Sequence, residues 1–148
     1  MESLLKTIGR RDRIDLPELG YSSIKAKIDT GAYGSAIHCS RIEIKQEDGK
    51  DILSFELFDP SYSKYKKKKC VFEQFDDKLV KSSSGDTEHR YSIITDAIIF
   101  GIKVRTEFSL TDRSQMKYPI LLGRKFLYNR FLVDVRLKDV SYRMKAKK

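Results

Sequence analysis

The sequence is poor in the residues that build disulfide scaffolds and metal cages. Only two cysteines occur in 148 residues, Cys39 and Cys70, which are too few for a disulfide framework, so we expect two reduced thiols. The only histidines are His38 and His89. Because a zinc cage takes three or four ligands, it would need every Cys and His in the chain. We therefore expect neither a metal site nor a cofactor.

Long apolar runs are also missing. No stretch approaches the roughly 20 apolar residues that a membrane-spanning helix needs, and the most apolar segment, 90–110, is interrupted by charges such as Asp96 and Lys103. Residues 1–13 lack the apolar core of a signal peptide. The sequence has no Gly-rich phosphate loop ending in Gly-Lys-Ser/Thr and no His-Glu-x-x-His. These absences predict a cytoplasmic protein and give no support for ATP- or zinc-dependent chemistry.

Positive charge is what the chain has in excess. Lys and Arg number 30 against 21 acidic residues, a formal net charge of +9. Such an excess favours acidic partners, whether nucleic acid, acidic peptide or anionic surface. Part of it lies in Lys66–Lys69, which we expect at a solvated hairpin tip and consider a candidate for a mobile hairpin over a binding cleft. Another part lies in residues 143–148, expected to form a frayed basic tail.

The apolar segments are short and rich in β-branched and aromatic residues, which is typical of strands. The length suits one domain over residues 1–148. Asp48-Gly49 between two apolar runs predicts a hairpin, and a second hairpin should turn near Phe100-Gly101. Residues 120–122 read as a short buried strand, and 123–130 as the only helix, of one or two turns. So many short strands imply an all-β sandwich or barrel.

The most informative segment is Asp29-Thr30-Gly31-Ala32, which follows the half-buried strand predicted over 23–28. Aspartic peptidases hold two carboxylates about 3 Å apart, where the like charges share one proton. One carboxylate activates a water and the other polarises the scissile carbonyl. Gly31 would let the backbone turn sharply, the Thr30 hydroxyl would reach the partner loop, and Ala32 offers the carboxylate no hydroxyl. On its own, however, Asp-Thr-Gly is also an ordinary turn sequence.

A second element supports the catalytic interpretation. Residues 118–124 contain Ile120-Leu121-Leu122-Gly123-Arg124, and a short helical pattern follows. This order resembles that of retropepsins, in which an apolar-apolar-Gly element packs beside the catalytic loop. The resemblance implies a small closed acid-protease β-barrel with one short C-terminal helix. It also implies that Asp29, Thr30, Gly31 and Ala32 form the catalytic loop.

Most of the chain resembles a bacterial and archaeal family labelled as ATP-dependent zinc proteases and better described as retropepsin-like. The segments that carry this resemblance are 8–11, 15–20, 24–32, 35–38, 82–85 with Glu88 and Arg90, 109–114, Met116, 119–124 and 130–134. Some members of that family are linked to ATP-grasp glutamate ligases and are thought to trim glutamate tails. The resemblance therefore implies acidic or glutamylated peptides as substrates. Gly34 departs from the Thr or Ser that the family often has there.

Asp-Thr-Gly occurs only once, whereas an aspartic peptidase needs two such loops. A working site therefore requires a two-fold homodimer in which Asp29 faces the partner's Asp29. Arg113 and Arg124 are candidates for binding substrate carboxylates bidentately. The alternative is that they pair with acids such as Asp112 or Asp134. In retropepsins the Arg after the late Gly tends to support the dimer, which favours the structural role for Arg124.

Two other functions stay open at this point. The same barrel could be a non-catalytic binding module, which a strictly monomeric chain would favour. It could also be a basic barrel that binds nucleic acid by stacking bases on some of its eight Tyr and eight Phe. Most of these aromatics fall at apolar strand positions, where core packing explains them first, so we expect a peptide rather than nucleic acid as the partner. Steep salt-dependent binding of single strands would favour the third function.

Overall fold

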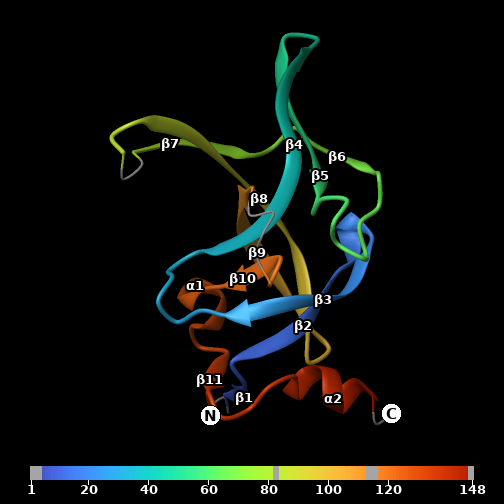
Figure 1. Cartoon of the computed structure of the whole chain (residues 1–148), viewed down its shortest axis with the longest axis vertical. Helices are drawn as coiled ribbons and strands as arrows, with labels where there is room; N and C mark the ends of the chain where they lie inside the picture. Colours follow the sequence, from blue (N-terminus) through green and yellow to red (C-terminus); the bar gives the residue numbers. More distant parts are fainter. Residues whose placement is uncertain (1–4, 82–83, 113–116, 147–148) are drawn as a thin grey trace.

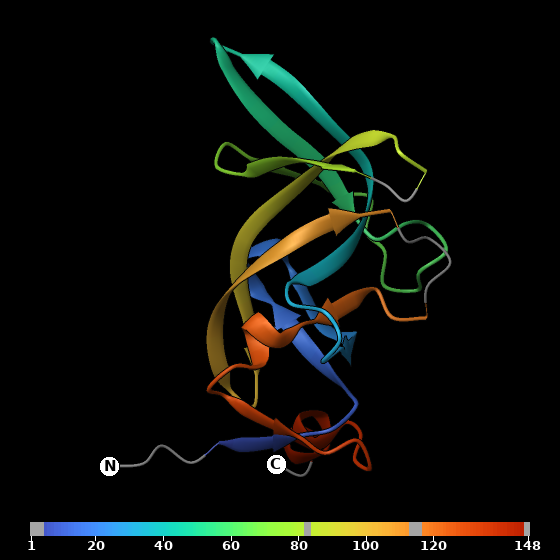
Figure 2. The ribbon, with the colours of Figure 1, turned by 90° about the vertical axis from the view of Figure 1, so that its left-hand side faces the viewer.

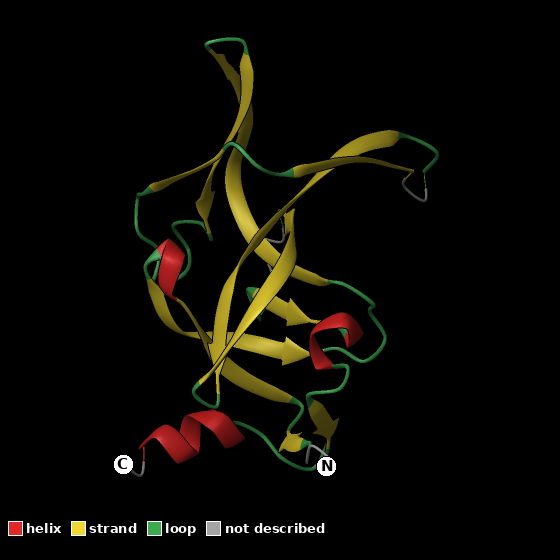
Figure 3. Ribbon diagram, turned by 180° about the vertical axis from the view of Figure 1, so that it is seen from behind, coloured by secondary structure: helices red, strands yellow, loops and turns green. Residues whose placement is uncertain are grey.

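The computed structural model describes residues 5–81, 84–112 and 117–146, and strands dominate it (Figures 1 and 3). In chain order the elements are β1 Lys6–Ile8, β2 Arg11–Leu16, the 3-10 helix η1 Pro17–Leu19, β3 Tyr21–Ile28, β4 Ser35–Glu47, β5 Lys50–Leu57, β6 Lys69–Phe72, β7 Asp76–Lys81, β8 Thr87–Ile99, β9 Ile102–Thr111, β10 Ile120–Leu122, α1 Arg124–Leu127, β11 Phe131–Val133 and α2 Val140–Ala146.

Six strands close into a barrel in the order β10-β3-β2-β8-β9-β4. The three-residue strand β10 closes it, because β10 pairs in parallel with β3 on one side and antiparallel with β4 on the other. All three β10 residues are buried. Alternate residues of the surrounding strands fill the interior, among them Ile14, Ile24, Ile37 and Phe108. The predicted all-β acid-protease barrel is therefore confirmed.

Two arms extend from the barrel (Figure 1). One is the hairpin of β4 and β5, whose turn at Asp48 and Gly49 has positive φ at both residues, 52° and 77°. This conformation matches the twist of the flanking strands and favours Asn, Asp and Gly. The other arm is β7, paired antiparallel with the first half of β8. The second half of β8 returns to the barrel and turns into β9 at Phe100 and Gly101, as the sequence predicts.

The end of the barrel opposite the arms carries β1, β11 and α2 (Figures 1 and 2). β1 and β11 form a separate two-stranded parallel sheet. The described residues contain two short α-helices, so the prediction of a single helix is wrong. Residues 143–146 were expected to fray but belong to α2, while 147–148 lie outside the described residues. Neither α1 nor α2, the α-helices of the described chain, is long and apolar enough to cross a membrane.

The placement predicted for Lys66–Lys69 is only partly right: the four lysines are exposed, but they do not form a free hairpin tip. Lys66 lies in the connection between β5 and β6, and this connection packs against the turn between η1 and β3. The Lys66 Nζ donates to the Gly20 carbonyl at 2.6 Å, and its backbone N–H donates to the Tyr21 hydroxyl at 3.1 Å. The lysine run is therefore not a free hairpin tip, because its first member is bonded to a distant turn.

Candidate active site

Asp29 stands where the central strand β3 ends. Strand β3 pairs in parallel with β10, so that Ile28 lies opposite Leu122. The hydrogen-bond ladder continues one residue further, because the Asp29 N–H donates to the Leu122 carbonyl at 2.9 Å. The backbone of Asp29 is thus fixed by the two strands that close the barrel, while its side chain is half-buried. A carboxylate at this point is rigidly placed and still reachable by solvent.

The loop after Asp29 turns tightly around the carboxylate. The Gly31 N–H donates to Asp29 Oδ1 at 3.0 Å, and the Ala32 N–H donates to the Asp29 carbonyl at 3.2 Å. A Cβ atom added to Gly31 would stand 3.3 Å from Asp29 Oδ1, which is a tight contact. Thr30 is exposed. The four predicted loop residues therefore form one compact turn, with the carboxylate and the Thr30 side chain available to a partner.

Gly123 clamps the far side of this loop. A Cβ atom there would stand 2.3 Å from the Gly34 carbonyl oxygen and 2.7 Å from that of Tyr33, so only glycine permits this approach. The Gly123 N–H donates to Ser35 Oγ at 3.1 Å, and the Arg124 N–H donates to the Ala32 carbonyl at 2.8 Å. The late apolar-Gly element thus packs directly on the loop that carries Asp29.

Arg124 contacts the loop itself. Its Nη1 donates to the Thr30 carbonyl at 3.0 Å, and its guanidinium carbon lies 5.9 Å from the centre of the Tyr33 ring. The acid Asp134, weighed as a partner for Arg124, instead pairs with Arg136 at 2.7 Å. These contacts make Arg124 a positioning residue for the loop. Arg113, the other arginine proposed from the sequence, lies outside the described residues.

Asp29 lies in an open cleft of about 710 Å³. The cleft runs from the Asp29 loop past the start of β4, the start of β8 and the end of β9. Residues lining it include Asp29, Ala32, Ser35, Glu88, His89, Arg90, Thr111 and Asp112. The arm that borders Asp29 is therefore the β7–β8 arm. The Lys66 region, our sequence-based candidate for this role, does not line the cleft.

Charged residues on β8 face this cleft and are paired among themselves or with β7. Arg90 Nη2 lies 3.2 Å from Glu88 Oε1, and His89 Nδ1 lies 2.8 Å from Asp77 Oδ1. Glu88 and Arg90 are among the residues that resemble the family. Nothing in the sequence, however, indicated that they lie beside Asp29. Strand β8 brings them there, because Ser92, two residues after Arg90, pairs with the cleft residue Ser109 of β9.

A buried histidine lies under the β9 end of the cleft. His38 Nε2 stands 2.5 Å from Asp59 Oδ2, and its Nδ1 stands 3.3 Å from the carbonyl oxygen of the cleft residue Thr111. Hydrogen bonds from the Ser61 hydroxyl first, and then from His38, hold the pKa of Asp59 below its ordinary value. From the sequence alone, His38 could be considered only as a possible metal ligand. Its position could be found only through the fold.

Metal-binding residues do not gather in the described parts of the chain, where no group of three His, Cys, Asp or Glu side chains could hold an ion. Cys39 and Cys70 are both buried free thiols. Burial raises the pKa of the Cys39 thiol well above its ordinary value, which disfavours the thiolate that binds metals.

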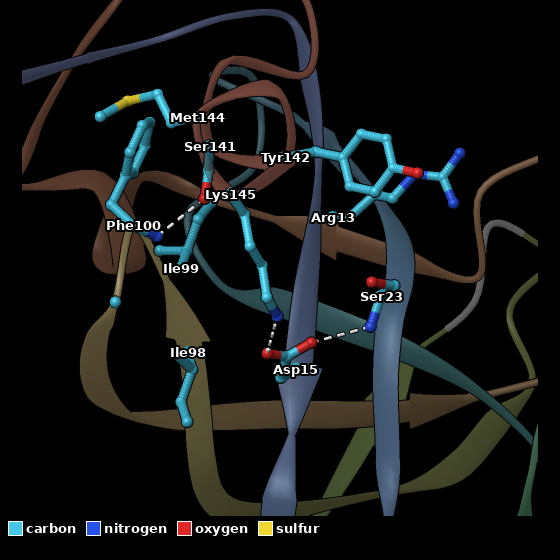
Figure 4. Close-up of a pocket in the computed structure, with 11 residues that line it drawn as sticks. Arg13, Asp15, Ser23, Ile98, Ile99, Phe100, Ser141, Tyr142, Met144 and Lys145 are labelled. Carbon is cyan, nitrogen blue, oxygen red and sulfur yellow. Dashed lines mark hydrogen bonds and ion pairs between the residues drawn. The ribbon is translucent and has the colours of Figure 1, made fainter. Parts of the chain in front are cut away.

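A second cavity, of about 370 Å³, lies between α2 and the β8–β9 turn (Figure 4). Ile98, Ile99, Phe100 and Met144 give it an apolar lining, and Lys145 pairs across it with Asp15 at 3.2 Å. It contains neither Asp29 nor any residue of the Asp29 loop. The two cavities therefore offer different environments, and of these two only the first contains Asp29.

Comparison with known proteins agrees with this geometry. A family model described as RimB-like, retropepsin-like aspartic endopeptidase RimB, matches residues 7–144. A probable alpha-L-glutamate ligase of Desulfotalea psychrophila is 33% identical over 133 residues, covering 90% of this chain and 29% of the ligase. One from Shewanella pealeana is 36% identical over 127 residues, covering 86% of this chain and 28% of the ligase. The chain thus spans less than a third of these relatives.

The fold is also shared with a solved structure. The crystal structure of Lpg0085, a protein of unknown function from Legionella pneumophila, superposes with a TM-score of 0.70 and 22% sequence identity. The match covers 92% of this chain and 98% of that one. At this identity the likeness supports the barrel fold.

Proposed function

Since this chain belongs to the RimB-like family of retropepsin-like aspartic endopeptidases, we propose that it is one subunit of a homodimeric peptidase. In this proposal Asp29 of each subunit supplies one of the two catalytic carboxylates. The observation that carries it is the Asp29 loop, fixed by β10 and Gly123 and open to a cleft of about 710 Å³. The exposed apolar side chains Leu132 and Val135, 58% and 69% accessible, are available for subunit contacts.

The chemistry needs both carboxylates. One Asp29, ionised, takes a proton from a water as the water oxygen forms a bond to the scissile carbonyl carbon. The partner's Asp29, protonated, donates its proton to the carbonyl oxygen, giving a neutral tetrahedral intermediate. When the C–N bond breaks, the first Asp29 gives its proton to the leaving nitrogen, and the partner's Asp29 takes a hydroxyl proton of the intermediate as the carbonyl re-forms. The pair of carboxylates ends with the single shared proton with which it began.

Acidic or glutamylated peptides are the proposed substrates. The proposed location of the protein is the cytoplasm. Two observations support this class of substrate. The relatives that contain a domain like this chain bear the name of probable alpha-L-glutamate ligases, and glutamate addition creates acidic tails. The net charge of +9 would attract such tails. In this proposal the chain removes what a glutamate ligase adds.

The Asp29→Asn variant tests the peptidase proposal. With oligoglutamate-bearing peptides and a general peptide pool as substrates, we expect the variant to lose about 10²–10⁴-fold in rate. Asp51→Asn, on the exposed β4–β5 arm, is the matched control and should keep full activity. Excess Asp29→Asn subunits should also inhibit wild-type protein by forming mixed dimers. Equal cleavage by both variants would refute the assignment.

A non-catalytic binding module on the same barrel is the second candidate. The observation that favours it is that the chain brings only one Asp-Thr-Gly loop, so a monomer cannot hold a carboxylate pair. Gel filtration over a range of concentrations separates the two candidates. A chain that stays monomeric at high concentration supports the binding module, whereas a dimer supports the peptidase.

A further inference from the structure

The outer face of β2 and β3 pairs cations with cations. Arg11 lies opposite Lys27, and Arg13 lies opposite Lys25, in neighbouring antiparallel strands. Side chains directly opposite one another are about 4.5–5.5 Å apart at Cβ, and like charges in such pairs destabilise a sheet. The two pairs are separated by two residues along the strand, roughly 6.6 Å. The arrangement therefore has an electrostatic cost that a bound anion would offset.

Groups within the chain compensate this charge only in part. Arg11 has partners, since Asp139 lies 3.6 Å from its Nε and its Nη1 donates to the Tyr118 hydroxyl at 3.4 Å. Among the described residues, neither Lys25 nor Lys27 has an acidic side chain within ion-pair distance. The cost of the Arg13–Lys25 pair thus stays largely uncompensated.

Arg13 is held in place but is not satisfied. Its guanidinium carbon lies 4.4 Å from the centre of the Tyr142 ring, within the range of a cation–π contact (Figure 4). Its Nε is buried and has no hydrogen-bond partner in the described parts of the chain. The other N–H groups of an Arg guanidinium are suited to an oxyanion, because they can bind two of its oxygens at once.

These cations meet at a small cavity of about 80 Å³. Arg11, Arg13, Lys25 and Lys117 line it, together with the carboxylates of Asp12 and Asp139. Both acids already have partners. Asp12 accepts the N–H groups of Ser141 and Tyr142 at 2.9 and 3.1 Å, and Asp139 is the partner of Arg11. The volume suits a group of a few heavy atoms, because one water molecule takes about 30 Å³.

A neighbouring lysine also responds to this positive field. Burial first, and then repulsion by Arg13, hold the pKa of Lys64 below its ordinary value, although Asp15 acts in the opposite direction. The Lys64 Nζ donates to the Ser22 and Ser23 carbonyls at 3.0 and 2.8 Å, so it is held close to the cluster on its β3 side.

We propose that the cation cluster of Arg11, Arg13, Lys25 and Lys117 is a binding site for a phosphate group. A phosphate monoester carries about −1.5 to −2 charges and three strong acceptor oxygens. Arg13, Lys25 and Lys117 are the three cations of the cluster without an acidic partner within the described chain. A phosphate therefore matches them better than a single carboxylate does. The site is separate from the Asp29 cleft, because the two cavities share no lining residue. It does not depend on peptidase activity.

Inorganic phosphate is the first probe. We expect saturable shifts of the backbone amide signals of β2 and β3 in a heteronuclear NMR titration of the full chain at constant ionic strength. Lys25→Gln and Lys117→Gln should each weaken phosphate binding about tenfold, through loss of a charge-assisted hydrogen bond. Arg13→Lys, which keeps the charge and removes the planar guanidinium, should also weaken it. Lys50→Gln, on the distant β4–β5 turn, is the control and should bind as the wild type does.

Competition identifies the source of the phosphate. Displacement by a short single-stranded oligonucleotide would assign a nucleic-acid backbone, and its absence would assign a free phosphate or a nucleotide. Both results keep the site. Amide shifts that grow linearly with phosphate and equal those caused by sodium chloride would overturn the site. Equal phosphate binding by the control Lys50→Gln and by the three variants of the cluster would also overturn it. Tighter binding of tetraglutamate than of phosphate would do the same. Asp29→Asn should leave phosphate binding unchanged, which separates this site from the peptidase proposal.

Discussion

Gly123 controls how closely the Asp29 loop and the late apolar element approach each other. Three consecutive carbonyl oxygens, those of Ala32, Tyr33 and Gly34, would stand within 2.8 Å of a Cβ atom at this position. The resemblance to retropepsins implied that an apolar-Gly element would lie beside the loop. It could not show that the contact is made by backbone carbonyls, because main-chain atoms leave no pattern in side-chain identity.

Gly123→Ala should therefore damage both stability and activity. We expect a loss of about 1–3 kcal/mol in the free energy of unfolding, which is typical of overpacking. We also expect an activity loss of roughly 10²-fold from displacement of Asp29. Gly34→Ala is the matched control, because an added Cβ meets nothing within 4 Å there. Urea unfolding and peptide cleavage measure the two effects, and equal behaviour of both variants would contradict the clamp.

Asp59 should make the fold sensitive to acid. Its pKa is held below the ordinary value by Ser61 and His38, so the folded state favours the ionised form. The stabilisation is complete above the unfolded pKa of about 3.9 and is lost as the pH falls through the lower folded value. Between pH 5 and pH 3, Asp59→Asn should lose less stability than the wild type in urea unfolding. The exposed Asp76→Asn serves as control and should follow the wild type.

At the scale of elements, the strands and turns were predictable and α2 was not. The hairpins at Asp48-Gly49 and Phe100-Gly101 could be predicted because turn preferences depend on neighbouring residues alone. Helix α2 depends instead on Asp12 of β2, which is buried and accepts the N–H groups of Ser141 and Tyr142. A cap supplied from a strand near the other end of the chain is invisible in the helix's own sequence. Because this cap cannot be seen in residues 143–148, their basic composition suggested a frayed tail.

The docking of α2 can be tested through this cap. Asp12→Ala leaves buried N–H groups without acceptors and should cost about 1–3 kcal/mol of unfolding free energy. The loss should be concentrated in faster amide exchange of residues 140–146. Lys145→Gln, which removes only the exposed ion pair with Asp15, should change stability by less than about 1 kcal/mol. If both variants cost the same, Asp12 is not the residue that holds the helix.

At the scale of the whole molecule, the barrel followed from the number of short strands and from the family resemblance. The positions of its arms did not. The sequence favoured the Lys66 region as the hairpin over the cleft, whereas β8 provides Glu88, His89 and Arg90 to that cleft. The reason is that strand order in a barrel is set by long-range pairing, here β8 with both β2 and β9, which local patterns do not encode.

The proposed peptidase activity requires Asp29 to be one half of a carboxylate pair. A crystal structure of the chain at concentrations where it self-associates measures this directly, through the distance between the carboxyl oxygens of the two Asp29 residues. We predict a two-fold dimer in which these oxygens lie about 3 Å apart. A monomer, or a dimer that holds the two Asp29 carboxylates far apart, would contradict the proposed carboxylate pair.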